Sequence, residues 1–162
     1  MLFRSFEAAR KELGPEIELL HDAHERYTPS EAVQLCKDLE QYRLFFLEDP
    51  LSPEDIMWFP NIRAQTTTPL AMGELFNSPH EWTPLIKDRL IDYMRMHISQ
   101  MGGLTPARKV AAFGEIFNVR TAFHGPGDVS PPLKGAKAGW LRMARATRIA
   151  STHSRRSWSV ER

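Results

Sequence analysis

The sequence predicts an α/β fold in which about five parallel strands alternate with flanking helices. Short apolar runs alternate with amphipathic segments five times, and no hairpin signal separates the runs. Three of the runs end in carboxylates, Asp22, Glu48 and Glu74, which follow one another at equal intervals of 26 residues. Such an interval holds one strand, one helix and two short loops, the unit of a TIM-type (β/α) barrel. Because eight units need about 250 residues, these 162 residues predict a partial barrel.

The expected elements follow from hydrophobic periodicity and from the residues that begin and end helices. Thr28 is expected to cap a helix, since Pro29 suits the first helical position and Glu31 completes a capping box. Ser52 is expected to open another helix in the same way. Gly14-Pro15 ends the first helix. The expected strands cover 17–22, 43–49, 68–74, 90–97 and 119–124, and the expected helices begin near 2, 28, 52, 78 and 105.

The charge distribution divides the chain into two parts. Residues 1–132 carry 13 Lys or Arg against 19 Asp or Glu, whereas residues 133–162 carry 8 against 1. We therefore expect an incomplete barrel domain over 1–132 and a divergent basic tail over 133–162. A basic tail suggests nucleic acid, but the abrupt change to Arg, Ser and Trp favours a shift of reading frame, and no nucleic-acid partner is expected.

Cysteine content and hydropathy predict a cytoplasmic protein. Cys36 is the only cysteine, so an intrachain disulfide cannot form and a reducing compartment is expected. Its neighbours Leu35 and Leu39 favour a buried structural thiol over a nucleophile. No apolar run approaches the roughly 20 residues that span a membrane, so no membrane partner is expected.

The three evenly spaced carboxylates predict a metal site. Parallel strands all end at the same edge of a sheet, so Asp22, Glu48 and Glu74 are expected to converge there. Converging carboxylates repel each other unless a cation lies between them. Oxygen ligands alone suit a hard divalent ion, above all Mg²⁺. The competing interpretation is that each carboxylate caps the helix that follows it.

Other polar residues are expected at the same edge. His24 follows Asp22 by two positions, so both would point the same way if the strand continues. A histidine able to transfer a proton would then stand beside a metal carboxylate. His21 and His97 are interpreted as structural. The remaining polar residues at or just beyond strand ends are Asp49, Arg95, His124 and Asp128.

Five segments of the chain combine the strand ends and helix starts described above: LLHDAHERYTPSEA, FFLEDPLSPED, TPLAMGELFN, DYMRMHISQMGGLTPARKVA and RTAFHGPGDVSP. Together they resemble the mannonate dehydratase group of the enolase superfamily over residues 1 to about 132. The resemblance implies a modified TIM barrel, of which this chain would supply part of the C-terminal domain, and a separate capping domain. It implies a carbon–oxygen lyase that converts D-mannonate to 2-keto-3-deoxy-D-gluconate.

The resemblance also implies roles for single residues. Asp22, Glu48 and Glu74 would be the Mg²⁺ ligands, and His24 would be the acid that protonates the departing hydroxyl. A glutamate of the family is expected near position 151, where this chain has Ser151. The residues that would contact the sugar-acid substrate are Glu74, Arg95, His124 and Asp128.

Two alternatives to mannonate dehydration stay open on the sequence. One is the dehydration of gluconate or another sugar acid by the same chemistry. The other is a non-catalytic remnant that keeps affinity for the metal or the sugar acid. The short length, and the upstream position of the family's capping domain and proton-abstracting loop, favour a truncated chain that is inactive by itself. The resemblance would also allow a homo-oligomer.

Overall fold

The computed structural model describes residues 2–124, apart from the side chain of Leu2, and has an α/β architecture. Among these residues five strands form one parallel sheet, in the same order as in the sequence. This confirms the predicted parallel sheet and its number of strands. The strands are β1 (Leu20–Asp22), β2 (Phe46–Glu48), β3 (Leu70–Met72), β4 (Tyr93–Met94) and β5 (Arg120–Thr121).

The strands are shorter than predicted, although backbone hydrogen bonds continue past their ends. Phe45 N–H donates to the Leu19 carbonyl before β2, and His124 N–H donates to the Met96 carbonyl after β5. The apolar runs therefore keep neighbouring chain segments side by side beyond the regular ladder.

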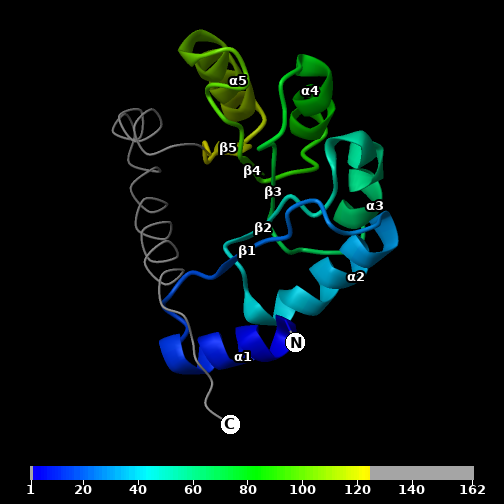
Figure 1. The fold of residues 1–162 in the computed structure, drawn as a ribbon, viewed down its shortest axis with the longest axis vertical. Coiled ribbons are helices and arrows are strands. Elements are labelled where there is room, and N and C mark those ends of the chain that lie inside the picture. The colour runs from blue at the N-terminus through cyan, green and yellow to red at the C-terminus, as the bar shows by residue number, and fades with distance from the viewer. Residues whose placement is uncertain (1, 125–162) are drawn as a thin grey trace.

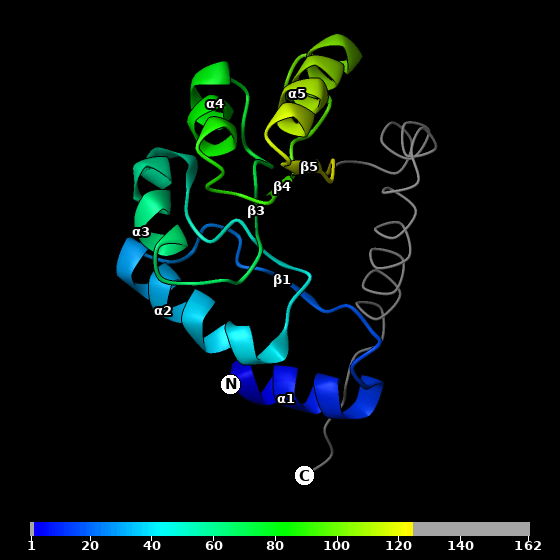
Figure 2. The same cartoon turned by 180° about the vertical axis from the view of Figure 1, so that it is seen from behind.

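Helices lie along one side of the row of strands, and both views show them spread around its outer face (Figures 1 and 2). The predicted helix starts are confirmed to within a residue or two for four of the five. No helix in the described part is long and apolar enough to cross a membrane. The α-helices are α1 (Leu2–Leu13), α2 (Pro29–Leu39), α3 (Phe59–Arg63), α4 (Pro79–Lys87) and α5 (Leu104–Ile116), with 3₁₀ turns η1 (Glu40–Tyr42) and η2 (Pro53–Trp58).

The segment after Ser52 departs from the prediction of a second helix like α2. It forms the 3₁₀ helix η2 first, and the α-helical turn α3 starts only at Phe59. Pro60 gives the physical reason, because it has no N–H to donate to Ile56 in a continuous α-helix. By contrast α2 begins as predicted, with the Thr28 N–H donating to the Glu31 carboxylate at 2.9 Å.

The alternation of side chains along each strand divides the interior into two clusters. Leu47, Met72 and Met94 point toward the helices and join the larger core. The smaller cluster lies on the other face and contains Phe46, Ala71, Tyr93 and Ala122, with Leu20 packed against it. Because side chains alternate between the two faces of a strand, a residue two positions after a member of the smaller cluster also lies on that second face. This face carries the candidate site.

Candidate metal centre

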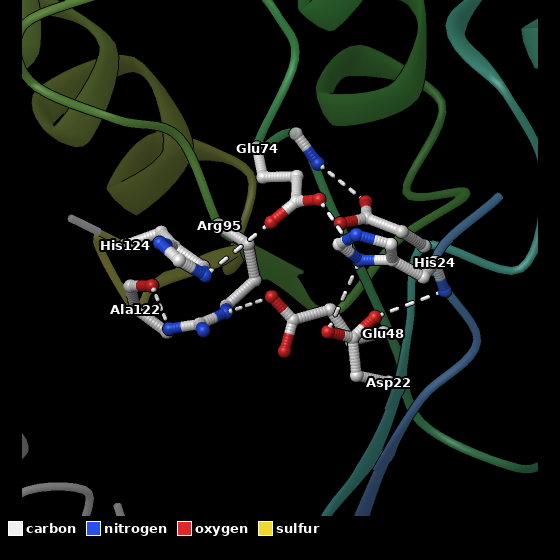
Figure 3. A network of polar contacts seen from close by, with 9 residues as sticks. Asp22, His24, Glu48, Glu74, Arg95, Ala122 and His124 are labelled. Atoms are coloured by element: carbon white, nitrogen blue, oxygen red, sulfur yellow. Dashed lines mark hydrogen bonds and ion pairs between the residues drawn. The ribbon is translucent and has the colours of Figure 1, made fainter.

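Polar side chains gather at the C-terminal ends of the strands (Figure 3). Asp22, Glu48, Arg95 and His124 each follow a residue of the second face by two positions, so all four project on that side of the sheet. Asp22 and Glu48 are directly paired in the β1–β2 ladder. Strand pairing therefore brings together residues that are up to 102 positions apart in the chain.

Glu48 and Arg95 form a buried ion pair at the centre of this edge. Arg95 Nε lies 2.6 Å from Glu48 Oε1, and its Nη1 donates to the Ala122 carbonyl at 2.9 Å. Glu48 is only 2% exposed. Burial raises the pKa of Glu48 against the effect of Arg95, and the nearby charges of Asp22 and Glu74 raise it further. The charges of Asp22 and Glu74 therefore act on Glu48, although the three predicted ligands are not among the described groups whose ligand atoms all lie within 4.8 Å of one another.

His24 lies between two of these carboxylates (Figure 3). Its Nδ1 is 3.4 Å from Asp22 Oδ2 and 3.1 Å from Glu74 Oε1. The condition that the strand continues to His24 is not met, because β1 ends at Asp22. His24 instead reaches this position in a turn, with a left-handed backbone of φ 54°. The Asp22 carboxylate holds this turn by accepting the His24 backbone N–H at 2.9 Å.

Glu74 reaches the edge through a turn that only glycine fits well. Gly73 has φ 130°, and a Cβ there would lie 2.9 Å from Met96 Cγ. The Glu74 side chain is nearly buried, and its two oxygens face different partners. Oε1 faces His24, whereas Oε2 lies 3.3 Å from His124 Nε2 (Figure 3).

His124 and His97 lie side by side after β5 and β4. They form a parallel β-bridge, and their ring centroids are 4.3 Å apart. Burial, with Arg95 and His97 as nearby positive charges, lowers the pKa of His124 to about 4. The sequence analysis did not expect this contact with His124, and the interpretation of His97 as structural stays a prediction.

Sequence reasoning also missed Glu25 as a member of the site. One oxygen each from Glu25, Asp49 and Glu74 lies within 4.8 Å of the others. Asp49 is fully buried, and its Oδ1 accepts the Gly73 N–H at 2.9 Å. Burial, opposed in part by that hydrogen bond, raises the pKa of Asp49 to about 8. Glu25 is itself a second left-handed residue, with φ 58°, so no strand periodicity could have predicted its direction.

The donors at this edge fit a hard cation. The carboxylates of Asp22, Glu48 and Glu74 leave three consecutive strands on one edge, and oxygen is the donor that Mg²⁺ prefers. Arg95 provides positive charge beside the Glu48 carboxylate. The metal-ligand role of the three carboxylates stays a prediction, and Asp128 lies outside the described residues.

The fold and this arrangement agree with a known family. The sequence profile of the enolase C-terminal domain-like family matches residues 3–157. The chain belongs to this family. A D-galactonate dehydratase family member of Salmonella enteritidis is 57% identical over 128 residues, and one of Enterococcus gallinarum is 54% identical over 129. The matches cover 79% and 80% of this chain but 30% and 32% of the relatives, so the chain spans about a third of their length.

Solved structures of this family are similar to the chain in both sequence and fold. An enolase from Pantoea ananatis with bound D-gluconate and Mg is 56% identical, with a TM-score of 0.76 over 79% of this chain and 31% of that one. The L-talarate dehydratase of Polaromonas, complexed with Mg and L-glucarate, is 28% identical, with a TM-score of 0.76 over 86% and 42%. These similarities confirm the partial (β/α) barrel and the enolase-superfamily resemblance.

Proposed function

We propose that this chain carries the Mg²⁺-binding edge of an acid-sugar dehydratase whose substrate is D-gluconate or a close epimer. The observation that carries the proposal is the emergence of three carboxylates from consecutive parallel strands at one edge. The relatives support sugar-acid chemistry, since their names refer to galactonate, and the Pantoea structure holds D-gluconate with Mg. They favour the gluconate alternative over D-mannonate, which none of these names mentions.

In this proposal Asp22, Glu48 and Glu74 hold the metal. Mg²⁺, when bound, supplies Lewis-acid stabilisation for the negative charge that develops when the proton beside the substrate carboxylate is removed. Arg95 keeps Glu48 oriented through the 2.6 Å contact and contributes a positive charge beside an anionic substrate.

His24 is proposed to protonate the departing hydroxyl. Hydroxide is a poor leaving group, so its departure needs a nearby acid. An imidazolium is one of the few side chains that can donate a proton at physiological pH. His24 fits because 56% of its side chain is exposed and its Nδ1 lies 3.4 Å from Asp22 Oδ2 and 3.1 Å from Glu74 Oε1.

Arg95, His124, Glu74 and Asp128 are proposed to contact the sugar acid. Arg95 offers charge to the substrate carboxylate, and His124 stands on the opposite side of Glu74 from His24, where it could reach a hydroxyl. The complete dehydratase activity is proposed to need parts of the barrel beyond residues 2–124. The relatives are about three times longer than the region that matches this chain.

Metal binding tests the first half of the proposal. Isothermal titration of Mg²⁺ into the 162-residue chain is expected to show one site that Asp22→Asn, Glu48→Gln and Glu74→Gln each weaken. Glu54→Gln is the matched control, since Glu54 is an exposed acid in η2. Equal Mg²⁺ affinity in the Asp22, Glu48 and Glu74 variants and in the control would contradict the proposed metal site.

Turnover tests the second half. In the full-length Salmonella relative, His→Asn at the position matching His24 should abolish formation of the 2-keto-3-deoxy acid and leave Mg²⁺ affinity unchanged. D-gluconate, D-mannonate and D-galactonate, offered separately, identify the preferred epimer. Unchanged turnover in the variant would contradict the acid role. A relative that bound D-gluconate without turning over any of the three would favour a binding protein.

A further inference from the structure

Two imidazoles and one carboxylate lie together at the ends of three adjacent strands. One ligand atom each from Glu74, His97 and His124 lies within 4.8 Å of the other two. Glu74 follows β3, His97 follows β4 and His124 follows β5, so each strand contributes one group. The parallel bridge between His97 and His124 holds their backbones at ladder distance. Strand pairing therefore holds the two histidines, and Glu74 joins them from the turn that follows β3.

We propose that Glu74, His97 and His124 form a second cation site, suited to a transition metal of the Zn²⁺ class. Imidazole nitrogen is a good ligand for Zn²⁺, whereas Mg²⁺ favours oxygen. Three protein ligands from a mixed nitrogen and oxygen set, with a fourth position open, are typical of non-structural Zn²⁺ sites. Bonds of about 2.0–2.2 Å at tetrahedral angles separate ligand atoms by roughly 3.4 Å. The distance of 3.3 Å between Glu74 Oε2 and His124 Nε2 already fits that geometry.

The two oxygens of Glu74 separate this site from the proposed Mg²⁺ site. Oε1 faces His24 on the Asp22 side, whereas Oε2 faces His124 (Figure 3). Glu74 is 7% exposed, so its carboxylate has little freedom to turn away from either side. A metal on the histidine pair would hold the carboxylate that the Mg²⁺ site also uses. This coupling rests on the proposed function, but the histidine site itself does not.

Arg95, whose positive charge acts on His124, is already engaged with other groups. Arg95 directs Nε at Glu48 and Nη1 at the Ala122 carbonyl (Figure 3). The carboxylate of Glu48 therefore offsets the guanidinium charge, and Glu74 supplies negative charge to the cation site itself. The local electrostatics allow a divalent cation beside His97.

Zn²⁺ binding to the 162-residue chain tests the site. Competition titration against a chelator is expected to give one tight Zn²⁺ per chain. His97→Ala should lower the affinity by at least about 100-fold, since changes even to groups behind the ligands cost 10–100-fold. His80→Ala is the matched control, because His80 is exposed on α4. Cys36→Ala should also match the wild type, since that thiol is buried away from the site.

A second measurement does not depend on how a variant folds. X-ray absorption of the Zn²⁺-loaded wild-type chain should show two imidazoles and no sulfur bound to the metal. Fewer than two imidazoles, a sulfur ligand, or wild-type affinity in His97→Ala would overturn the site. Asp22→Asn should lower Zn²⁺ affinity far less than His97→Ala does. The Zn²⁺ proposal can therefore fail while the Mg²⁺ proposal stands, and the reverse is also true.

Discussion

Asp49 joins the ends of three strands through both its backbone and its side chain. Its N–H donates to the Ala71 carbonyl at 2.9 Å, and its own carbonyl accepts the Glu25 N–H at 2.8 Å. The carboxyl Oδ1 accepts the Gly73 N–H immediately before Glu74. One fully buried residue thus orients the turn that carries a proposed metal ligand.

We expect Asp49→Ala to destabilise the fold and Asp49→Asn to be much milder. Alanine leaves the buried Gly73 N–H without its acceptor, which costs about 1–3 kcal/mol. The left-handed backbone at Asp49, with φ 43°, adds strain for alanine, whereas asparagine tolerates it and keeps an oxygen acceptor. Urea unfolding of both variants measures the difference. Equal losses for the two would show that the hydrogen bond to Gly73 is unimportant.

The Cys36 thiol is expected to make the stability of the fold depend on pH, independently of the candidate metal centre. Its thiol is buried in α2, and burial raises its pKa from 9.0 to about 12. In the unfolded chain the thiol loses its proton near pH 9, whereas in the folded chain it keeps the proton to about pH 12. The free energy of unfolding therefore falls as the pH rises from about 9 to about 12.

Cys36→Ala removes that penalty and isolates it from other titrations. Relative to this variant, the wild type should lose about 1.4 kcal/mol of unfolding free energy between roughly pH 7 and pH 10. Chemical denaturation of both proteins at the two pH values measures the change. Parallel losses in wild type and variant would mean that the thiol titrates normally in the fold.

Helix α5 approaches the sheet closely at Gly114. A Cβ at this position would meet Met94 Cε and would lie 2.9 Å from the Val119 carbonyl oxygen. The backbone oxygen cannot move aside as a flexible side chain can. The absence of a side chain at Gly114 thus sets how α5 packs on β4, the strand that precedes Arg95 and His97.

Gly114→Ala is expected to destabilise the chain, although alanine is the better helix former. Helix propensity would favour alanine by about 1 kcal/mol, but overpacking costs typically 1–3 kcal/mol. Ala112→Gly, at an exposed position of the same helix, measures the propensity effect alone. Thermal unfolding of Gly114→Ala, Ala112→Gly and the wild type measures the difference in stability. A more stable Gly114→Ala protein would show that α5 can move outward without cost.

The described sheet has two edge strands, β1 and β5, each paired on one side within residues 2–124. An edge strand presents unpaired backbone groups that can pair with another chain. In a closed barrel such edges do not exist. The relatives contain about three times the length of the matched region, so their barrels have more chain with which to cover these edges.

The isolated 162-residue chain is expected to self-associate and to give no turnover with D-gluconate and Mg²⁺. Self-association should grow with protein concentration, because edge-to-edge pairing is intermolecular. Size-exclusion chromatography over a concentration series, with an assay for 2-keto-3-deoxy acid on each peak, measures both outcomes. The full-length Salmonella relative is the positive control. A monodisperse monomer with turnover near that of the control would overturn this expectation.

The sequence by itself determined the order of the elements and much of the candidate edge. The apolar runs and the spacing of 26 residues need only local geometry, so they placed Asp22, Glu48, Arg95 and His124 at or just beyond strand ends on one edge of a parallel sheet. Capping residues likewise predicted the start of α2, because a cap involves neighbours in the chain. These are short-range rules that hold before the chain folds.

Only the tertiary structure decided which of these groups touch. The left-handed residues His24 and Glu25 redirect the chain after β1, so strand periodicity no longer applies there. Contacts such as Arg95 with Glu48 and His124 with Glu74 join separate strands. Burial then sets the charge of each group, because the cost of ionising a carboxyl or imidazole depends on the whole surrounding packing, which no local pattern encodes.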